Sequence, residues 1–122
     1  ARVQHVLHRC TDHDMVVVSP EYNGGFPGVL KYFIDMLEFP GSLSGVPCAF
    51  IGLSAGQFGA LRPIDQLSTL FLYRHAQVLG ERLYMPDINS ALVQDKSSGE
   101  WTVGPYEERL QKLLDTFLHS LK

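Results

Sequence analysis

The chain has 122 residues, 45% of them hydrophobic and 19% charged, which predicts one globular domain over residues 1–122 and argues against a disordered chain. Its 10 basic and 13 acidic residues give a net charge of −3, with no basic stripe of the kind that nucleic-acid binding requires. The apolar stretches are too short to span a bilayer and the first residues do not resemble a signal peptide, so we expect no membrane contact and a cytoplasmic protein.

Helices and strands alternate in the first half of the chain. The opening residues predict a helix with one apolar face, made of Val3, Val6, Leu7 and Cys10. Asp14 to Ser19 is predicted to be a strand, and its unbroken apolar run, Met15 to Val18, is expected of a strand that is covered on both faces. A second helix should follow and stop by Pro40-Gly41, with its buried face made of Val29, Leu30, Phe33, Ile34 and Leu37.

The second half continues the alternation. A buried strand is predicted from Cys48 to Leu53, followed by a loop and by a helix that has Pro63 in its first turn and ends at Gly80. This helix should turn four side chains inward: Ile64, Leu67, Phe71 and Val78. A third strand, Arg82 to Met85, and a polar loop, Asn89 to Gly104, precede a last helix with an apolar face made of Tyr106, Leu110, Leu113, Leu114, Phe117, Leu118 and Leu121.

This order predicts a parallel sheet with helices on both faces. A strand as apolar as Met15 to Val18 should have a neighbouring strand on each side, because an exposed apolar edge invites pairing with another chain. The chain also starts without methionine and inside a predicted helix. We therefore expect one or more β-α units to precede it.

The most informative segment is Pro20-Glu21-Tyr22-Asn23-Gly24-Gly25, between the first predicted strand and the next helix. Gly24 and Gly25 permit positive φ and a close approach of the backbone to a ligand. In open α/β sheets the carboxyl ends of the strands and the helix N-termini present unpaired N–H groups together, so ligands bind there. The sequence therefore predicts a ligand site at this turn.

The string from Ser19 to Lys31, with Asp35 on the same helix, resembles the signature of the NAD(P)H-dependent FMN reductase family. These are flavodoxin-like flavoproteins that include quinone, chromate and azo-dye reductases. A looser match is the loop from Gly52 to Gly59, which leads into Leu61-Arg62-Pro63. The resemblance implies a doubly wound, three-layer α/β/α fold with strand order 2-1-3-4-5, of which this chain holds strands 3, 4 and 5. The family's strands 1 and 2 and its phosphate-binding loop are absent from the sequence.

The resemblance also implies which residues hold the cofactor FMN, with NAD(P)H as co-substrate. In the first segment they are Pro20, Glu21, Tyr22, Asn23 and Gly24, whose main-chain N–H groups should bond the polar edge of the flavin ring. We expect the Asn23 side chain to be a neutral partner, Tyr22 to pack at the ring margin, and the Glu21 carboxylate to point away, toward a helix N-terminus or a subunit interface. In the second loop the candidates are Ser54, Ala55, Gly56 and Gln57, although an ordinary strand-to-helix loop explains them equally well.

Other chemistry finds little support in the sequence. Asp12-His13-Asp14 lacks the second cluster that would complete a metal site, and Ser54 lacks the G-x-S-x-G pattern of a nucleophile elbow. Cys10 and Cys48 are interpreted as reduced structural thiols, and His75 as a core histidine on the inner side of its helix. We identify no metal ligand and no catalytic acid or base, as expected where the cofactor carries the chemistry.

The favoured function is an oxidoreductase that passes electrons from NAD(P)H through FMN to a quinone or similar small acceptor. Two alternatives remain: a flavodoxin-type electron carrier, which usually shows a more acidic face, and a truncated, non-catalytic interaction module. We expect a homodimer or homotetramer, with Glu21 and Arg62 or Arg74 as charged interface partners. Without the phosphate-binding loop, residues 1–122 alone should bind FMN weakly.

Overall fold

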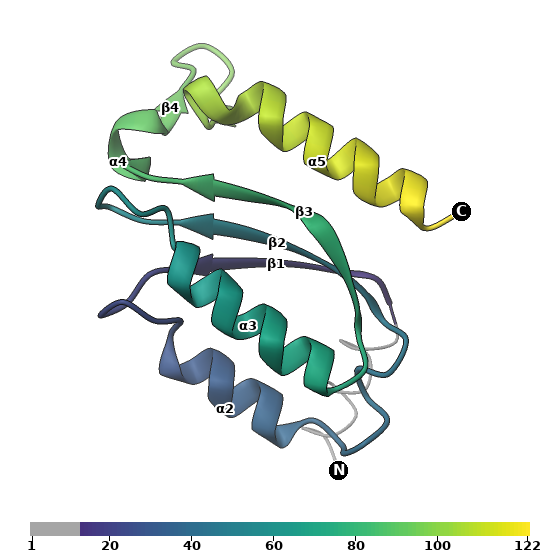
Figure 1. Ribbon diagram of the computed structural model, residues 1–122. Helices are drawn as coiled ribbons and strands as arrows, with labels where there is room; N and C mark the ends of the chain where they lie inside the picture. Colours follow the sequence, from purple (N-terminus) through teal and green to yellow (C-terminus); the bar gives the residue numbers. More distant parts are fainter. Residues whose placement is uncertain (1–12) are drawn as a thin grey trace.

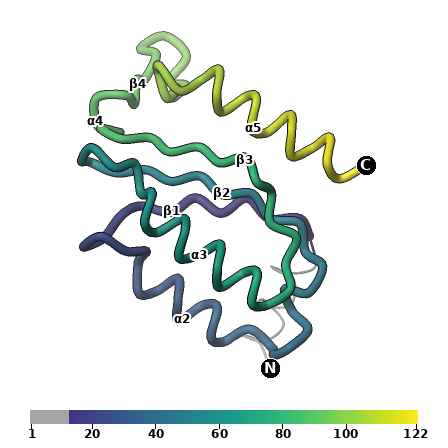
Figure 2. Tube along the Cα trace, viewed as in Figure 1, coloured from purple at the N-terminus to yellow at the C-terminus, as the bar shows by residue number. Residues whose placement is uncertain are grey.

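The computed structural model describes residues 13–122, which form a three-layer α/β/α arrangement (Figure 1). The central sheet has three parallel strands in the order β1 (Met15–Pro20), β2 (Pro47–Leu53) and β3 (Gln77–Met85). Helices α2 (Gly28–Met36) and α3 (Leu61–Tyr73) cover one face, and α5 (Glu107–Ser120) covers the other (Figure 2). The predicted parallel sheet with helices on both faces is confirmed, whereas the predicted first helix lies outside the described residues.

Two apolar clusters, one on each face, hold the layers together. Between the sheet and α2 and α3, the rings of Phe50 and Phe71 meet edge to face with their centroids 5.1 Å apart. On the α5 side, Ile51 and Leu83 pack against Leu113. Because side chains alternate across a strand, neighbouring residues of β2 contribute to different clusters, and β2 is buried along its centre. The unbroken apolar pattern of Cys48 to Leu53 was therefore interpreted correctly.

The boundary between α3 and β3 differs from the prediction. The helix ends at Tyr73, not at Gly80, and β3 begins at Gln77, so that Val78 and Gly80 belong to the strand. His75 has a φ of 64°, a left-handed conformation that does not continue a helix, and it is exposed rather than turned inward. Val78 fits the spacing of a helix and that of a strand equally well, and its assignment to the helix was wrong.

Two predicted buried faces are partly exposed. In β1, Val16 and Val18 are 41% and 53% exposed, because among the described residues the strand is covered only on the side of α2 and α3. Val29 was assigned to the buried face of α2 but is 74% exposed, and Leu118 of α5 is 59% exposed. The apolar character of these positions was therefore a poor guide to burial.

The segment predicted as a polar loop, Asn89 to Gly104, contains regular structure. A short helix α4 (Ile88–Ala91) leads into an antiparallel hairpin of β4 (Val93–Gln94) and β5 (Trp101–Thr102). A 3-10 turn at Gly104–Tyr106 then enters α5, so Tyr106 precedes the helix to which it was assigned. The Tyr106 hydroxyl donates to the carbonyl of Pro86 at 2.8 Å, which joins this segment to the end of β3.

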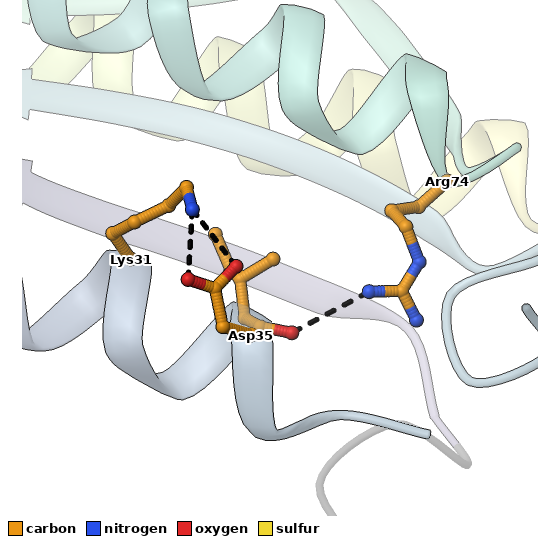
Figure 3. Close-up of polar contacts among 4 residues, drawn as sticks. Lys31, Asp35 and Arg74 are labelled. Atoms are coloured by element: carbon orange, nitrogen blue, oxygen red, sulfur yellow. Dashed lines mark hydrogen bonds and ion pairs between the residues drawn. The ribbon is translucent and has the colours of Figure 1, made fainter. Parts of the chain in front are cut away.

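A buried arginine fixes the far ends of α2 and α3 relative to each other. Arg74 is 7% exposed and donates from Nη2 to the Glu38 carbonyl at 2.8 Å and from Nη1 to the Ile34 carbonyl at 3.4 Å. Its guanidinium also lies over the ring of Phe39, 5.2 Å from the centroid. Figure 3 shows its guanidinium reaching a carbonyl in the last turn of α2, next to the exposed Lys31–Asp35 ion pair. Arg74 makes these contacts within its own chain, and its predicted role as a charged interface partner stays a prediction.

Candidate cofactor site

The carboxyl ends of β1, β2 and β3 lie at the same edge of the sheet, as parallel strands require (Figure 1). The first loop, Glu21 to Gly25, follows Pro20, the last residue of β1, and the second loop, Ser54 to Ala60, follows β2. The Glu21 N–H donates to the Leu53 carbonyl at 3.1 Å, so the two loops leave the sheet side by side. The structure therefore brings both predicted groups of site residues to one edge.

The first loop is closed by a tight turn. Tyr22 and Gly25 exchange two backbone hydrogen bonds, of 2.8 and 3.0 Å, around Asn23 and Gly24. These two central residues have positive φ, 53° and 74°, as a type I′ turn requires, and Asn-Gly is the dipeptide that favours this turn most strongly. The positive φ predicted for Gly24 is present, whereas Gly25 is not in that region and Asn23 takes the second such position.

The turn decides which backbone donors are left for a ligand. The N–H groups of Glu21, Tyr22 and Gly25 are already bonded within the protein. Those of Asn23 and Gly24 make no hydrogen bond to another residue in the part of the chain that the structure describes. Among the described residues, the N–H groups of Asn23 and Gly24 are therefore the main-chain donors of the first loop that remain for a cofactor. The side chain of Tyr22 beside them is exposed.

The second loop is organised around Ser54. Its side chain is buried, and its hydroxyl donates to the Gly56 carbonyl and accepts from the Gly59 N–H, each at 2.8 Å. Ser54 therefore supports the loop from inside. Beyond it Ala55, Gly56 and Gln57 are exposed, and within residues 13–122 their N–H groups have no hydrogen-bond partner.

The segment after β3 supports the second loop from the other side, a role that sequence reasoning missed. The N–H of Asp87 donates to the Gly56 carbonyl at 2.9 Å, and that of Ile88 donates to the Ser54 carbonyl at 3.0 Å. Asp87 has a φ of 50°, a conformation that Asp tolerates better than most residues. The only sequence signal was the Pro86-Asp87 pair directly after a strand.

A cation connects the two loops. Arg62, in the first turn of α3, has Nη1 3.8 Å from Oε1 of Glu21 and its guanidinium carbon 5.0 Å from the ring centroid of Phe58. Glu21 thus contacts the side chain of a residue in the first turn of α3, and its predicted direction toward a helix N-terminus or a subunit interface stays a prediction. Arg62 was predicted only as an interface partner, and its contact with Glu21 is made within one chain.

No second chemical centre emerges from the described residues. Within residues 13–122 there is no group of three His, Cys, Asp or Glu side chains arranged to hold a metal ion, and no helix long and apolar enough to cross a membrane. Burial, together with the charge of Asp14, raises the pKa of the Cys48 thiol to about 12. Cys48 is therefore a protonated thiol at neutral pH, and it lies near the start of β2, at the opposite end of the strand from the loops.

The topology defines a flavodoxin-like α/β protein, and the two loops at this edge form a candidate site whose free donors come from the backbone. This fold is similar to that of FerB, a flavoenzyme NAD(P)H:(acceptor) oxidoreductase from Paracoccus denitrificans, with a TM-score of 0.76 and 24% identity over 97% of this chain. The chain belongs to the NADPH-dependent FMN reductase family, whose model matches residues 1–89. It is also 44% identical over 50 residues to an NAD(P)H-dependent FMN reductase of Pseudomonas aeruginosa.

The matched regions cover only part of these relatives. The match to the Pseudomonas protein covers 39% of this chain and 27% of that protein, and the match to FerB covers 64% of the FerB chain. The family match includes the first loop and the second loop. It ends at residue 89, before the hairpin of β4 and β5 and before α5.

The residues at this edge fit the ring of FMN. A flavin ring presents carbonyl oxygens and ring nitrogens along one edge and flat apolar faces on both sides. Five N–H groups have no partner among the described residues and can donate to the polar edge of the ring. They belong to Asn23, Gly24, Ala55, Gly56 and Gln57. The exposed rings of Tyr22 and Phe58 add planar apolar surface. The donor set is thus of the kind that the ring needs, although only the backbone supplies it.

Proposed function

We propose that this chain forms the flavin-ring side of an NAD(P)H-dependent, FMN-binding oxidoreductase that delivers electrons to a quinone or a similar planar acceptor. The observation that carries the proposal is the pair of adjacent loops whose N–H groups are left without partners at the carboxyl edge of a parallel sheet. Membership of the NADPH-dependent FMN reductase family supports the choice of cofactor and co-substrate. Bound FMN would supply the redox chemistry by accepting a hydride and passing on its electrons.

In this proposal the residues of the chain bind the flavin ring and orient the molecules that react with it. The type I′ turn leaves the N–H groups of Asn23 and Gly24 without partners among the described residues, and the buried Ser54 hydroxyl fixes the shape of the second loop. The exposed rings of Tyr22 and Phe58 provide flat surfaces at the margin, against which a planar acceptor or the nicotinamide can pack. No side chain is required to act as an acid or a base.

We also propose that the protein forms a homo-oligomer through the outer surface of α2 and α3. These two helices and the segment after α2 expose Val29, Tyr32, Phe39, Leu72 and Tyr73, between 57% and 74% exposed. A hollow of about 300 Å³ lies between α2 and α3, lined by side chains that include Phe39, Leu70 and Tyr73. Concentrated exposure of large apolar side chains is typical of an interaction surface, and a second copy offers the same surface in return.

The turn can be tested with a flavin titration. Substitution Gly24→Val forces a β-branched residue into a φ of 74° and should cost about 1–3 kcal/mol locally. We expect the affinities for FMN and for riboflavin to fall by the same factor, roughly tenfold, because 1.4 kcal/mol corresponds to one decade. An equal loss for both ligands would place the turn at the ring rather than at the phosphate. Fluorescence quenching of each ligand measures the affinity.

Gly99→Val is the matched control. Gly99 also has a φ of 74°, so the same strain is introduced in the hairpin, away from both loops. It should leave both affinities unchanged. Equal flavin affinities in Gly24→Val and the parent would remove the turn from the site, and flavin binding without bleaching by NADPH would indicate an electron carrier instead.

A further inference from the structure

Glu21 is an acidic residue in a loop that we propose contacts a redox cofactor. Its side chain is only 13% exposed, whereas that of Arg62, at 3.8 Å, is 60% exposed. Among the described residues, Arg62 is the cation that forms an ion pair with Glu21. The carboxylate is thus largely shielded from water and depends on one neighbour for charge compensation.

The position of Arg62 is defined by both loops. Its guanidinium lies over Phe58 of the second loop, at a distance where a cation–π interaction is favourable. On the side of the first loop, a Cβ atom placed on Gly24 would lie 3.9 Å from Nη1, so the cation is next to the turn itself. Arg62 therefore carries its charge to the gap between the two loops.

A charge at this place affects the two oxidation states of a bound flavin differently. Transfer of a hydride from NAD(P)H leaves NAD(P)⁺ and gives the flavin one additional negative charge until a proton follows. A carboxylate nearby opposes this change, and a cation nearby favours it. Such a charge therefore changes the ratio of the affinities for reduced and oxidised flavin.

We propose that Arg62 is a positioning residue that offsets the charge of Glu21 and so raises the affinity for reduced flavin relative to oxidised flavin. The inference rests on the proposed function, because it assumes that the first loop contacts the flavin ring. It assigns Arg62 a role that differs from forming contacts between subunits. It also explains how an acidic residue is compatible with a site for a flavin that becomes anionic.

The test compares oxidised and reduced FMN under anaerobic, mildly alkaline conditions. For Arg62→Gln we expect the affinity for reduced FMN to fall about tenfold more than that for oxidised FMN, which lowers the two-electron midpoint potential by about 30 mV. Arg62→Lys keeps the charge and should retain most of the parental ratio. The double variant Glu21→Gln/Arg62→Gln should return close to the parental ratio, because both charges are gone.

The control removes a different cation. Lys112 of α5 forms a pair of similar length, 3.9 Å, with Glu81, so Lys112→Gln changes the net charge equally at a place remote from the loops. If Arg62→Gln and Lys112→Gln give the same ratio, or if the double variant does not recover, the inference is wrong while the proposed function stands. If the parent protein binds no flavin in either state, both are wrong.

Discussion

Gly52 shows how a single residue fixes the second loop. A Cβ atom at this position of β2 would lie 2.5 Å from the Gly59 carbonyl oxygen and 3.0 Å from side-chain atoms of Ala60 and Ile64. The end of β2, the loop and the start of α3 therefore approach each other more closely than any side chain allows. Gly56, in the exposed part of the same loop, would meet nothing within 4 Å.

The difference between Gly52 and Gly56 predicts how an added methyl group changes the stability of the protein at each position. Gly52→Ala should lower the free energy of unfolding by about 1–3 kcal/mol, because the added carbon overpacks a contact made of backbone atoms that cannot move aside easily. Gly56→Ala should change it by less than about 0.5 kcal/mol. Urea unfolding of the two variants beside the parent measures both values. Equal stabilities would mean that α3 can shift away from β2 without cost.

The first loop illustrates local determination at the same scale. Asn23-Gly24 specifies a type I′ turn through its own backbone preferences, which act without any distant contact. The N–H groups left free by that turn follow from its hydrogen-bond pattern. Which of the neighbouring donors were already used, however, depended on the pairing of Glu21 with Leu53 on another strand.

At the scale of whole elements, α2 and α3 depend on Arg74 for their mutual position. Its two hydrogen bonds go to the carbonyl of Ile34, in the last turn of α2, and to the carbonyl of Glu38, in the segment just after the helix. A charged donor is well suited to these carbonyls because the helix C-terminus carries partial negative charge. The same side chain covers the ring of Phe39.

Removal of this side chain should therefore loosen the helix pair. We expect Arg74→Ala to lower the free energy of unfolding by about 1.5–3 kcal/mol, the range for hydrogen bonds to charged groups. Arg109→Ala, at an exposed position of α5, should stay within about 0.5 kcal/mol of the parent. Thermal and urea unfolding measure the difference. A loss no greater than that of Arg109→Ala would show that α2 is held by its apolar face alone.

At the scale of the whole molecule, the proposed oligomer makes the exposed side of α2 and α3 a testable surface. The double variant Tyr32→Glu/Leu72→Glu places two charges among exposed apolar side chains and should shift the protein toward monomer by at least tenfold in dissociation constant. Leu118→Glu, which charges a similarly exposed residue on α5, is the control and should leave assembly unchanged. Sedimentation equilibrium measures the distribution, and a parent that is monomeric at micromolar concentration would contradict the proposal.

The sequence by itself determined the features that arise from local preferences and from hydrophobic periodicity. Apolar runs predicted β1 and β2, and β3 was also predicted, although its start was placed too late. Pro63 in the first turn of α3 and the Asn23-Gly24 turn followed from the backbone conformations that these residues favour. The motif from Ser19 to Lys31 also identified the family correctly.

The tertiary structure decided what depends on which elements meet. Val16, Val29 and Leu118 have the apolar character of core residues, but whether each is buried depends on whether another element covers it. Val78 fits both a helix and a strand, and the left-handed His75 before it decides between them. The contact between Glu21 and Arg62, 41 residues apart in sequence, exists only because β1 and α3 both end or begin at one edge of the sheet. Hydrophobic periodicity describes a single helix or strand, whereas burial and contacts of this kind depend on how two elements pack together.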